Sequence, residues 1–110
     1  MTVWRIVSLP EVEGDLRRLD KEQERKVQKA IRRVATNPLP SFQGGYGKPL
    51  GNTASNKLSG LQKIKLRGEG LRIVYKLVER DDVMLVVVVG VRDNDDVYKE
   101  AARRKEKYDL

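Results

Sequence analysis

The fold is decided by the stretch KLSGLQKIKLRGEGLRIVY, which covers residues 57–75. Cationic and aliphatic side chains alternate along it, two glycines interrupt the pattern, and the alternation then resumes. An alternation with period two is typical of a β-strand with one apolar and one polar face, and glycines between two such runs are typical of a hairpin. The stretch therefore predicts a β-hairpin with one apolar face and one strongly cationic face.

The length of the turn decides which residues of this hairpin face each other. A two-residue turn and a four-residue loop give the same pairing, whereas an odd loop would bury a lysine. In that pairing Lys65 lies opposite Arg72, and Lys63 and Arg67 share their face. The apolar face pairs Leu66 with Leu71 and Ile64 with Ile73. Because like charges directly opposite each other are unfavourable, either the cationic face binds an anion or its lysines are simply solvated.

The composition favours a polyanionic partner and excludes several kinds of site. The chain has 110 residues, 23 of them basic and 16 acidic, with a formal net charge of +7. This charge favours nucleic acid over a membrane, because no amphipathic segment also has a broad apolar face. Cysteine and histidine are absent. Disulfides, zinc sites built from these residues and histidine-based acid–base pairs are therefore excluded, and we expect no metal and no cofactor.

Length and hydropathy predict a single cytoplasmic domain over residues 1–110. A chain of this size supports one hydrophobic core but not two. The N-terminus lacks the charged and then apolar run of a signal peptide, and the longest apolar run is far too short to cross a membrane. We therefore expect no membrane partner.

The N-terminal part predicts a strand followed by a helical hairpin. Residues 2–8 have the composition of a short strand, which Pro10 ends because proline cannot continue a ladder. Residues 11–19 repeat apolar side chains at helical spacing, and Asp20 is a typical N-cap for a second helix that ends near residue 37. The basic outer face of that second helix either contacts phosphates or is solvated. The apolar positions are Val12, Leu16 and Leu19 in the first helix, and Val27, Ala30, Ile31 and Val34 in the second.

Residues 38–56 predict a long loop. They contain three of the four prolines and four of the nine glycines. A loop of this length is uncommon in a compact domain unless it is functional or disordered. Phe42 and Tyr46 either stack on nucleic acid bases or pin the loop to the core.

The remaining elements complete an α+β fold. Residues 83–89 are continuously apolar, which is typical of a strand buried on both faces. The last helix, residues 95–107, has only Val97, Ala101 and Ala102 as an apolar stripe, so we expect it to be the least firmly docked element. The order of elements predicts a mostly antiparallel four-stranded sheet packed against the N-terminal helical hairpin, plus a C-terminal helix. With helices on one face, the cationic face would be open to a ligand.

Five segments in this order resemble the RelE family of toxins from type II toxin–antitoxin pairs. They are Lys57-Leu58, Lys63-Ile64-Lys65-Leu66-Arg67, Gly70-x-Arg72-x-Val74-Tyr75, Val89-Gly90-x-Arg92 and Val97-Tyr98. The resemblance is close over about half of the chain, and the N-terminal strand and helical hairpin agree in order and length. It implies a RelE-like fold.

The resemblance also implies an activity and partners. It implies an endoribonuclease, or mRNA interferase, that cleaves messenger RNA in the ribosomal A site and inhibits translation. The implied catalytic residues are Lys63, Lys65, Arg72, Arg92 and Tyr98, with Lys57 and Arg67 as RNA-binding cations. The implied partners are a RelB-like antitoxin, in a hetero-oligomer, and the ribosome with its mRNA. The antitoxin is expected either to cover the cationic face or to displace the last helix.

These residue types suit RNA cleavage without a metal ion. The RNA 2′-hydroxyl attacks the adjacent phosphorus, so the enzyme must accept a proton, stabilise the transition-state charge and protonate the leaving 5′-oxygen. Neighbouring cations favour the neutral form of a lysine, which makes Lys65 a candidate base, while Tyr98 either shares that role or stacks on a base. Lys63 and Arg72 suit transition-state stabilisation. Arg92 would lie by the leaving oxygen, first as a charge stabiliser, because guanidinium rarely gives up its proton.

Two other functions remain open. A ParE-like toxin of the same fold, which inhibits DNA gyrase, would need no nuclease activity and no such set of five residues. A non-catalytic basic RNA-binding module would explain the net charge but not the spacing of Arg92 and Tyr98.

Overall fold

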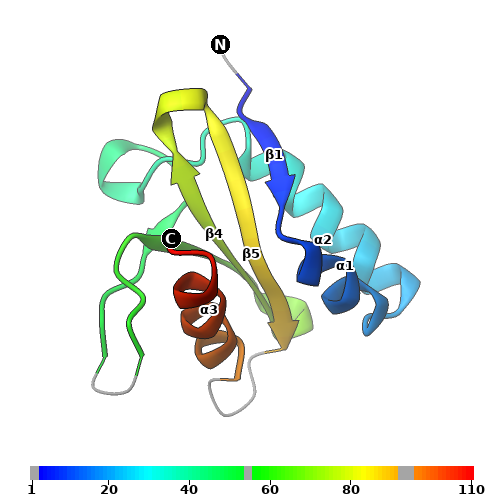
Figure 1. Cartoon of the computed structure of the whole chain (residues 1–110). Coiled ribbons are helices and arrows are strands. Elements are labelled where there is room, and N and C mark those ends of the chain that lie inside the picture. Colours follow the sequence, from blue (N-terminus) through cyan, green and yellow to red (C-terminus); the bar gives the residue numbers. More distant parts are fainter. Residues whose placement is uncertain (1–2, 54–55, 92–95) are drawn as a thin grey trace.

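The computed structural model describes residues 3–110 except 54, 55 and 92–95, and describes only the backbone of Arg67. Within these ranges the chain forms a five-stranded sheet with strand order β1-β5-β4-β3-β2 and three α-helices (Figure 1). The strands are β1 (Arg5–Ser8), β2 (Lys48–Pro49), β3 (Leu61–Leu66), β4 (Leu71–Val78) and β5 (Val83–Val91). The helices are α1 (Pro10–Arg17), α2 (Lys21–Val34) and α3 (Asp96–Lys107). β1 runs parallel to β5, and the other neighbouring strands are antiparallel.

The β3–β4 hairpin has the register that the sequence predicts. The observed pairs are Lys65 with Arg72, Ile64 with Ile73 and Leu66 with Leu71. The two strands are joined by a four-residue loop, which consists of a 3₁₀ turn over Arg67–Glu69 and then Gly70. The φ of Gly70 is 63°, a left-handed conformation that glycine adopts at little cost. The predicted separation of the two faces is confirmed.

Residues 38–56 supply a fifth strand, so the predicted four-stranded sheet is one strand too small. β2 pairs with β3 over only two residues, which is too short to show an alternating pattern in the sequence. The Pro38 carbonyl oxygen anchors the loop by accepting hydrogen bonds from the Tyr75 hydroxyl at 2.7 Å and the Gln62 side-chain amide at 3.3 Å. Gly47 lies so close to these two side chains that a methyl group there would overlap both. These contacts bring the loop onto the edge of the sheet.

The two aromatic side chains of this loop do not pin it to the core. Phe42 is 77% exposed and Tyr46 is 49% exposed. The Tyr46 ring lies under the guanidinium of Arg33 from α2, with 5.4 Å between the guanidinium carbon and the ring centroid. The anchoring role therefore belongs to Pro38, and base stacking by the aromatic residues stays a prediction.

The N-terminal helices have the cap and the apolar stripes that the sequence predicts. Pro10 begins α1, because its fixed φ and missing N–H suit the first helical turn. Asp20 accepts a hydrogen bond from the Gln23 backbone N–H at 2.7 Å, and the Gln23 side chain accepts one from the Asp20 N–H. The fully buried stripe positions are Val12, Val27, Ile31 and Val34. No helix in the described ranges is both long enough and apolar enough to span a membrane.

α3 lies on the opposite side of β4 and β5 from α1 and α2, so the helices do not share one face as predicted (Figure 1). Cross-strand pairing puts Arg72 and Gly90 together on the α3 side, next to the pair Val74 and Val88. A methyl group on Gly90 would lie 3.4 Å from the Val97 side chain of α3, so helix and strand approach closely here. The cationic face is basic at Lys63, Lys65 and Arg72. It is aliphatic at Val74 of β4 and Val88 of β5, and this aliphatic part accepts the helix.

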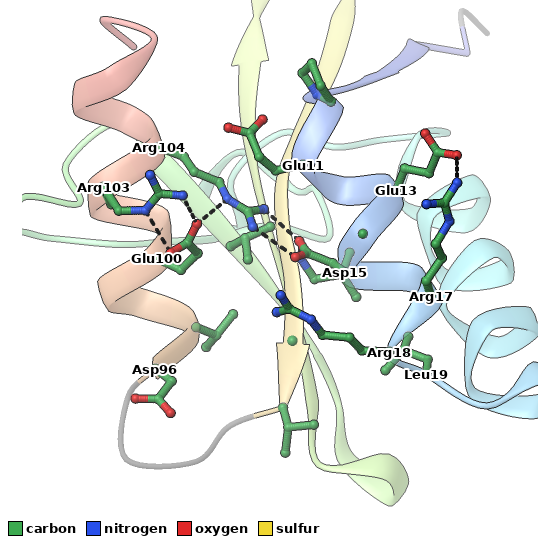
Figure 2. Close-up of a pocket in the computed structure, with 17 residues that line it drawn as sticks. Glu11, Glu13, Asp15, Arg17, Arg18, Leu19, Asp96, Glu100, Arg103 and Arg104 are labelled. Atoms are coloured by element: carbon green, nitrogen blue, oxygen red, sulfur yellow. Dashed lines mark hydrogen bonds and ion pairs between the residues drawn. The ribbon is translucent and has the colours of Figure 1, made fainter.

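A buried ion pair fastens α3, which corrects the prediction of a weakly docked helix. The guanidinium of Arg104 donates two hydrogen bonds to the Asp15 carboxylate of α1, at 2.7 and 2.9 Å (Figure 2). The two side chains are only 5% and 4% exposed. Arg104 also donates to the Val87 carbonyl oxygen at 2.9 Å and to the Glu100 carboxylate at 2.6 Å. Removing one partner of a buried pair typically costs about 3–5 kcal/mol, because the other charge stays buried without compensation.

A second, more exposed link joins α3 to α1. The Glu11 carboxylate accepts hydrogen bonds from Lys107 Nζ at 2.9 Å and from the Tyr108 hydroxyl at 2.8 Å. These hydrogen bonds, that of Lys107 first, lower the pKa of Glu11 from 4.5 to about 2. On β4, Lys76 donates a hydrogen bond to the Leu110 backbone carbonyl oxygen. Polar contacts therefore supplement the thin apolar stripe of the helix.

Replacing Tyr75 by phenylalanine should destabilise the fold by removing the hydrogen bond to Pro38. We expect the Tyr75→Phe variant to lose about 0.5–1.5 kcal/mol of unfolding free energy, measured by urea denaturation. The Tyr46→Phe variant removes the same hydroxyl from an exposed ring of the same loop and should unfold like the wild type. Equal effects of the two changes would contradict the anchoring role of Tyr75.

The Glu11 link should contribute stability only while its carboxylate is charged. The folded pKa of about 2 lies below the unfolded value of 4.5, so the contribution is complete above pH 4.5 and is lost as the pH falls towards 2. We therefore expect the difference in Tm between the wild type and Glu11→Gln to be largest above pH 5 and to shrink on acidification. A difference that stays constant from pH 6 to pH 2.5 would argue against this link.

Candidate functional site

β3 and β4 place three of the predicted catalytic residues on one face of the sheet. Lys65 and Arg72 are direct cross-strand partners, and Lys63 lies opposite Val74. Side chains two positions apart in a strand point to the same side, so all three basic residues face the side on which α3 lies. Lys65 is exposed, Lys63 is half-buried and Arg72 is buried. The basic side chains thus extend from solvent to the interior beside α3.

Arg72 is a buried cation with unused hydrogen-bonding capacity. Only 7% of the residue is exposed, and its Nη1 donates a hydrogen bond to the Leu71 carbonyl oxygen at 3.0 Å. Its Nε has no acceptor within the described part of the chain. A buried donor without an acceptor is unfavourable, and a charged one more so. A phosphate oxygen that reached this position would supply the acceptor.

α3 brings Tyr98 to the same place. The Nζ atom of Lys63 lies 5.8 Å from the centroid of the Tyr98 ring, within the range of a cation–π contact. Tyr98 is half-buried, and the preceding residue, Val97, is buried. Two segments distant in the sequence, β3 and the first turn of α3, therefore meet at the site.

The other predicted site residues are less closely associated with this cluster. Lys57 is exposed in the loop before β3, next to Leu58, which is buried. The Asn52 side-chain oxygen fixes this loop by accepting hydrogen bonds from the backbone N–H groups of Leu58 and the following serine, both at 2.9 Å. Arg92 lies outside the described residues, as does the side chain of Arg67. Their roles stay predictions.

Lys48 of β2 is a basic residue of this face that the sequence did not reveal. It pairs directly with Lys63, so the two side chains share a face, and it is exposed. The cationic face thus has two pairs of like charges, Lys48 with Lys63 and Lys65 with Arg72. Such pairs are unfavourable without an anion. A strand of two residues has no periodicity, so the only sequence signal was a lysine in a loop.

A groove of about 950 Å³ lies elsewhere, between α1 and α3 beside the end of β5 (Figure 2). Its charged side chains largely pair with each other: Glu13 binds Arg17 at 2.6 Å, and Glu100 binds Arg103 at 2.5 Å. The buried Asp15–Arg104 pair also belongs to its wall. Because positive and negative charges are matched here, the cationic face, and not this groove, is the candidate site for a polyanion.

The arrangement on the cationic face suits chemistry on a phosphodiester. Basic side chains held in place bind phosphate oxygens and stabilise the negative charge that develops during phosphoryl transfer. A lysine or a tyrosine can accept or donate a proton when it lies within hydrogen-bond reach of the reacting group. Lys65 and Tyr98 supply these two types of group beside Lys63 and Arg72.

Several solved structures of similar shape are RelE toxins. A double-mutant form of the Escherichia coli toxin RelE in the free state superposes with a TM-score of 0.73 at 23% identity, covering 94% of this chain and 98% of that one. A RelBE toxin–antitoxin complex from Mycobacterium tuberculosis contains a chain with a TM-score of 0.69 at 18% identity, covering 84% of this chain and 94% of that one. At these identities the likeness concerns the fold alone.

Sequence comparison adds closer relatives, although no family model matches the chain. The mRNA interferase toxin RelE of E. coli is 43% identical over 53 residues, which are 46% of this chain and 56% of that protein. The chain therefore spans about half the length of this curated relative. A putative RelE-like toxin protein of E. coli is 32% identical over 90 residues, covering 79% of this chain and 81% of that one. This extended match, together with the common fold, shows that the chain belongs to the RelE-like toxin family.

Proposed function

We propose that this chain is the toxin of a toxin–antitoxin pair and an endoribonuclease that cleaves mRNA. The observation that carries the proposal is the meeting of Lys63, Lys65 and Arg72 with Tyr98 on one face of the sheet. The relatives support it, because the E. coli protein with 43% identity is named an mRNA interferase toxin. The net charge of +7 favours a polyanionic substrate as well.

In the proposed mechanism the RNA 2′-hydroxyl attacks the adjacent phosphorus, the bond from phosphorus to the 5′-oxygen breaks, and the 5′-oxygen takes up a proton as it leaves. Lys65 accepts the hydroxyl proton, since the positive charge of Arg72 directly across from it favours the neutral form of a lysine. Lys63 and Arg72 stabilise the charge on the phosphorus oxygens. Tyr98 shares the proton transfer or stacks on a base. Arg92 is assigned to the leaving oxygen by the family resemblance.

We propose further that cleavage takes place in the ribosomal A site and needs no metal ion. The side chains supply the positive charge that a metal would otherwise provide. The chain has no histidine, the side chain best suited to proton transfer near neutral pH. A site without it gains most from a substrate that is already held in the reactive geometry, and the ribosome can hold mRNA in this way.

The proposed protein partner is a RelB-like antitoxin that forms a hetero-oligomer with this chain. Chains of the same fold come from complexes of RelE with RelB, including the intact E. coli complex with a TM-score of 0.62. A basic surface such as the cationic face requires an inhibitor that covers it or that changes the position of α3. An antitoxin would serve in either way.

Changing Lys65 or Tyr98 to alanine should abolish most of the cleavage. We expect purified wild-type protein to cut mRNA on programmed ribosomes, with the cuts mapped by primer extension, and each variant to be about 10²–10³-fold slower in single-turnover assays. The Lys29→Ala variant removes an exposed lysine from α2, on the opposite side of the sheet, and should cleave at the wild-type rate.

Two outcomes would contradict the proposal. Unchanged cleavage by the Lys65→Ala and Tyr98→Ala variants would show that the reaction uses other groups. Absence of cleavage by the wild type, combined with inhibition of DNA supercoiling by gyrase, would favour a ParE-like toxin instead.

Lys48 should contribute to substrate binding more than to the reaction. We expect Lys48→Gln to raise the KM for programmed ribosomes about five-fold at ~0.1 M salt and to reduce the salt slope of binding by about 0.7, as for the loss of one phosphate contact to a single strand. The value of kcat should stay close to that of the wild type. Lys29→Gln is the matched control, and an equal effect of both changes would mean that only net charge matters.

A further inference from the structure

The ion pair of Asp15 and Arg104 is placed to do more than hold two helices together. It joins residues 89 positions apart in the sequence, one in α1 and one in α3. The Asp15 carboxylate also accepts the Val89 backbone N–H at 3.0 Å, and the Arg104 guanidinium also donates to the Val87 carbonyl oxygen at 2.9 Å. Both members of the pair are thus bonded to the backbone of β5, the strand on which α3 lies.

We infer that Asp15 and Arg104 are positioning residues for the cleavage site: their bidentate pair sets where α3 lies on the sheet, and so holds Tyr98 beside Lys63. The inference rests on the proposed function in treating Tyr98 and Lys63 as members of the catalytic site. Neither Asp15 nor Arg104 lies on the cationic face, and neither is expected to touch RNA.

α3 is held at two points on one side. Val97 packs against Gly90 of β5, and Arg104 bonds to the Val87 carbonyl oxygen of the same strand. These helix positions are seven residues apart, which is about two turns, so they lie on the same side of α3. Tyr98 adjoins the first of the two points and reaches towards Lys63. A shift or rotation of the helix at the Arg104 end would therefore change the position of the Tyr98 ring.

The apolar side chains of α3 between these two points define its position only weakly. Between the two points the buried apolar side chain is Ala101, which is fully covered, while Ala102 is half-buried. Alanine side chains bury little area and form shallow ridges, so they select one axial position of a helix only weakly. A planar guanidinium with two parallel bonds to a carboxylate is strongly directional. In this helix the ion pair supplies the directional contact.

The direct test replaces Arg104 by lysine, which keeps the positive charge but loses the two-pronged geometry. We expect Arg104→Lys to lower kcat on programmed ribosomes by on the order of 10- to 100-fold, because small displacements of a catalytic group have effects of this size, and to change KM less than two-fold. The control is Lys107→Gln, which removes the ion pair of Lys107 with Glu11 from the exposed link between α1 and α3 and should leave both constants unchanged.

A double-mutant cycle distinguishes an effect of Arg104 on the position of Tyr98 from a general effect on folding stability. If Arg104 acts through Tyr98, the Arg104→Lys change should cost little further activity in a Tyr98→Ala background, where there is no ring left to position. If the effects of Arg104→Lys and Tyr98→Ala on kcat multiply in the double variant, the inference is overturned. A wild-type kcat combined with a lower Tm in Arg104→Lys would also overturn it. Asp15→Glu, which keeps the charge but moves the carboxylate, should behave like Arg104→Lys.

An NMR measurement tests the position of the ring without reference to cleavage. The Tyr98 ring should shift the side-chain proton resonances of Lys63, and Tyr98→Phe should retain most of this shift. We expect the shift to fall by half or more in Arg104→Lys and to persist in Lys107→Gln. An unchanged shift in Arg104→Lys would overturn the inference even if the proposed activity is correct, whereas a wild type that shows the shift but cuts no mRNA would count against the proposed function alone.

Discussion

The unpaired edge of β5 is the constraint on which much of this structure depends. β1 pairs with β5 only up to Val86, whose carbonyl oxygen accepts a hydrogen bond from the Leu9 N–H at 3.0 Å. Pro10 then starts α1, so within the described residues β5 continues to Val91 without a neighbouring strand on that side. Buried backbone groups need partners, and exposed strand edges promote association with other chains. Side chains from two helices take the place of the missing strand.

This edge explains why two charges are buried in so small a protein. Arg104 donates a hydrogen bond to the Val87 carbonyl oxygen, and Asp15 accepts one from the Val89 N–H. The two opposite charges also neutralise each other in the ion pair. Burial tends to lower the pKa of Arg104, but its hydrogen bonds to the Asp15 and Glu100 carboxylates outweigh this effect and leave the pKa raised. Arg104 therefore keeps its charge in this buried position, and α1, β5 and α3 are joined through the pair.

Local sequence patterns predict much of the fold but only part of the candidate site. Turn parity predicted the pairing of Lys65 with Arg72, and the capping pattern predicted the start of α2 at Asp20. The alternation in the hairpin does not reveal the side of the sheet on which α3 lies, because Val74 of β4 and Val88 of β5 add an aliphatic part to the cationic face. β2 was missed because two residues have no period, and Lys48 was missed with it.

The Asp15–Arg104 pair did leave a signal, because both charges interrupt apolar stripes. Asp15 lies three residues after Val12, and Arg104 lies seven after Val97, so each points towards the core side of its helix. A charge at such a position must be paired or moved to solvent, since isolated burial is prohibitively unfavourable. Two opposite charges of this kind in separate helices predict a buried contact between them. A helix with a thin apolar stripe then gains a defined position from the same pair that satisfies the strand edge, so the proposed placement of Tyr98 and the protection of the edge depend on one interaction.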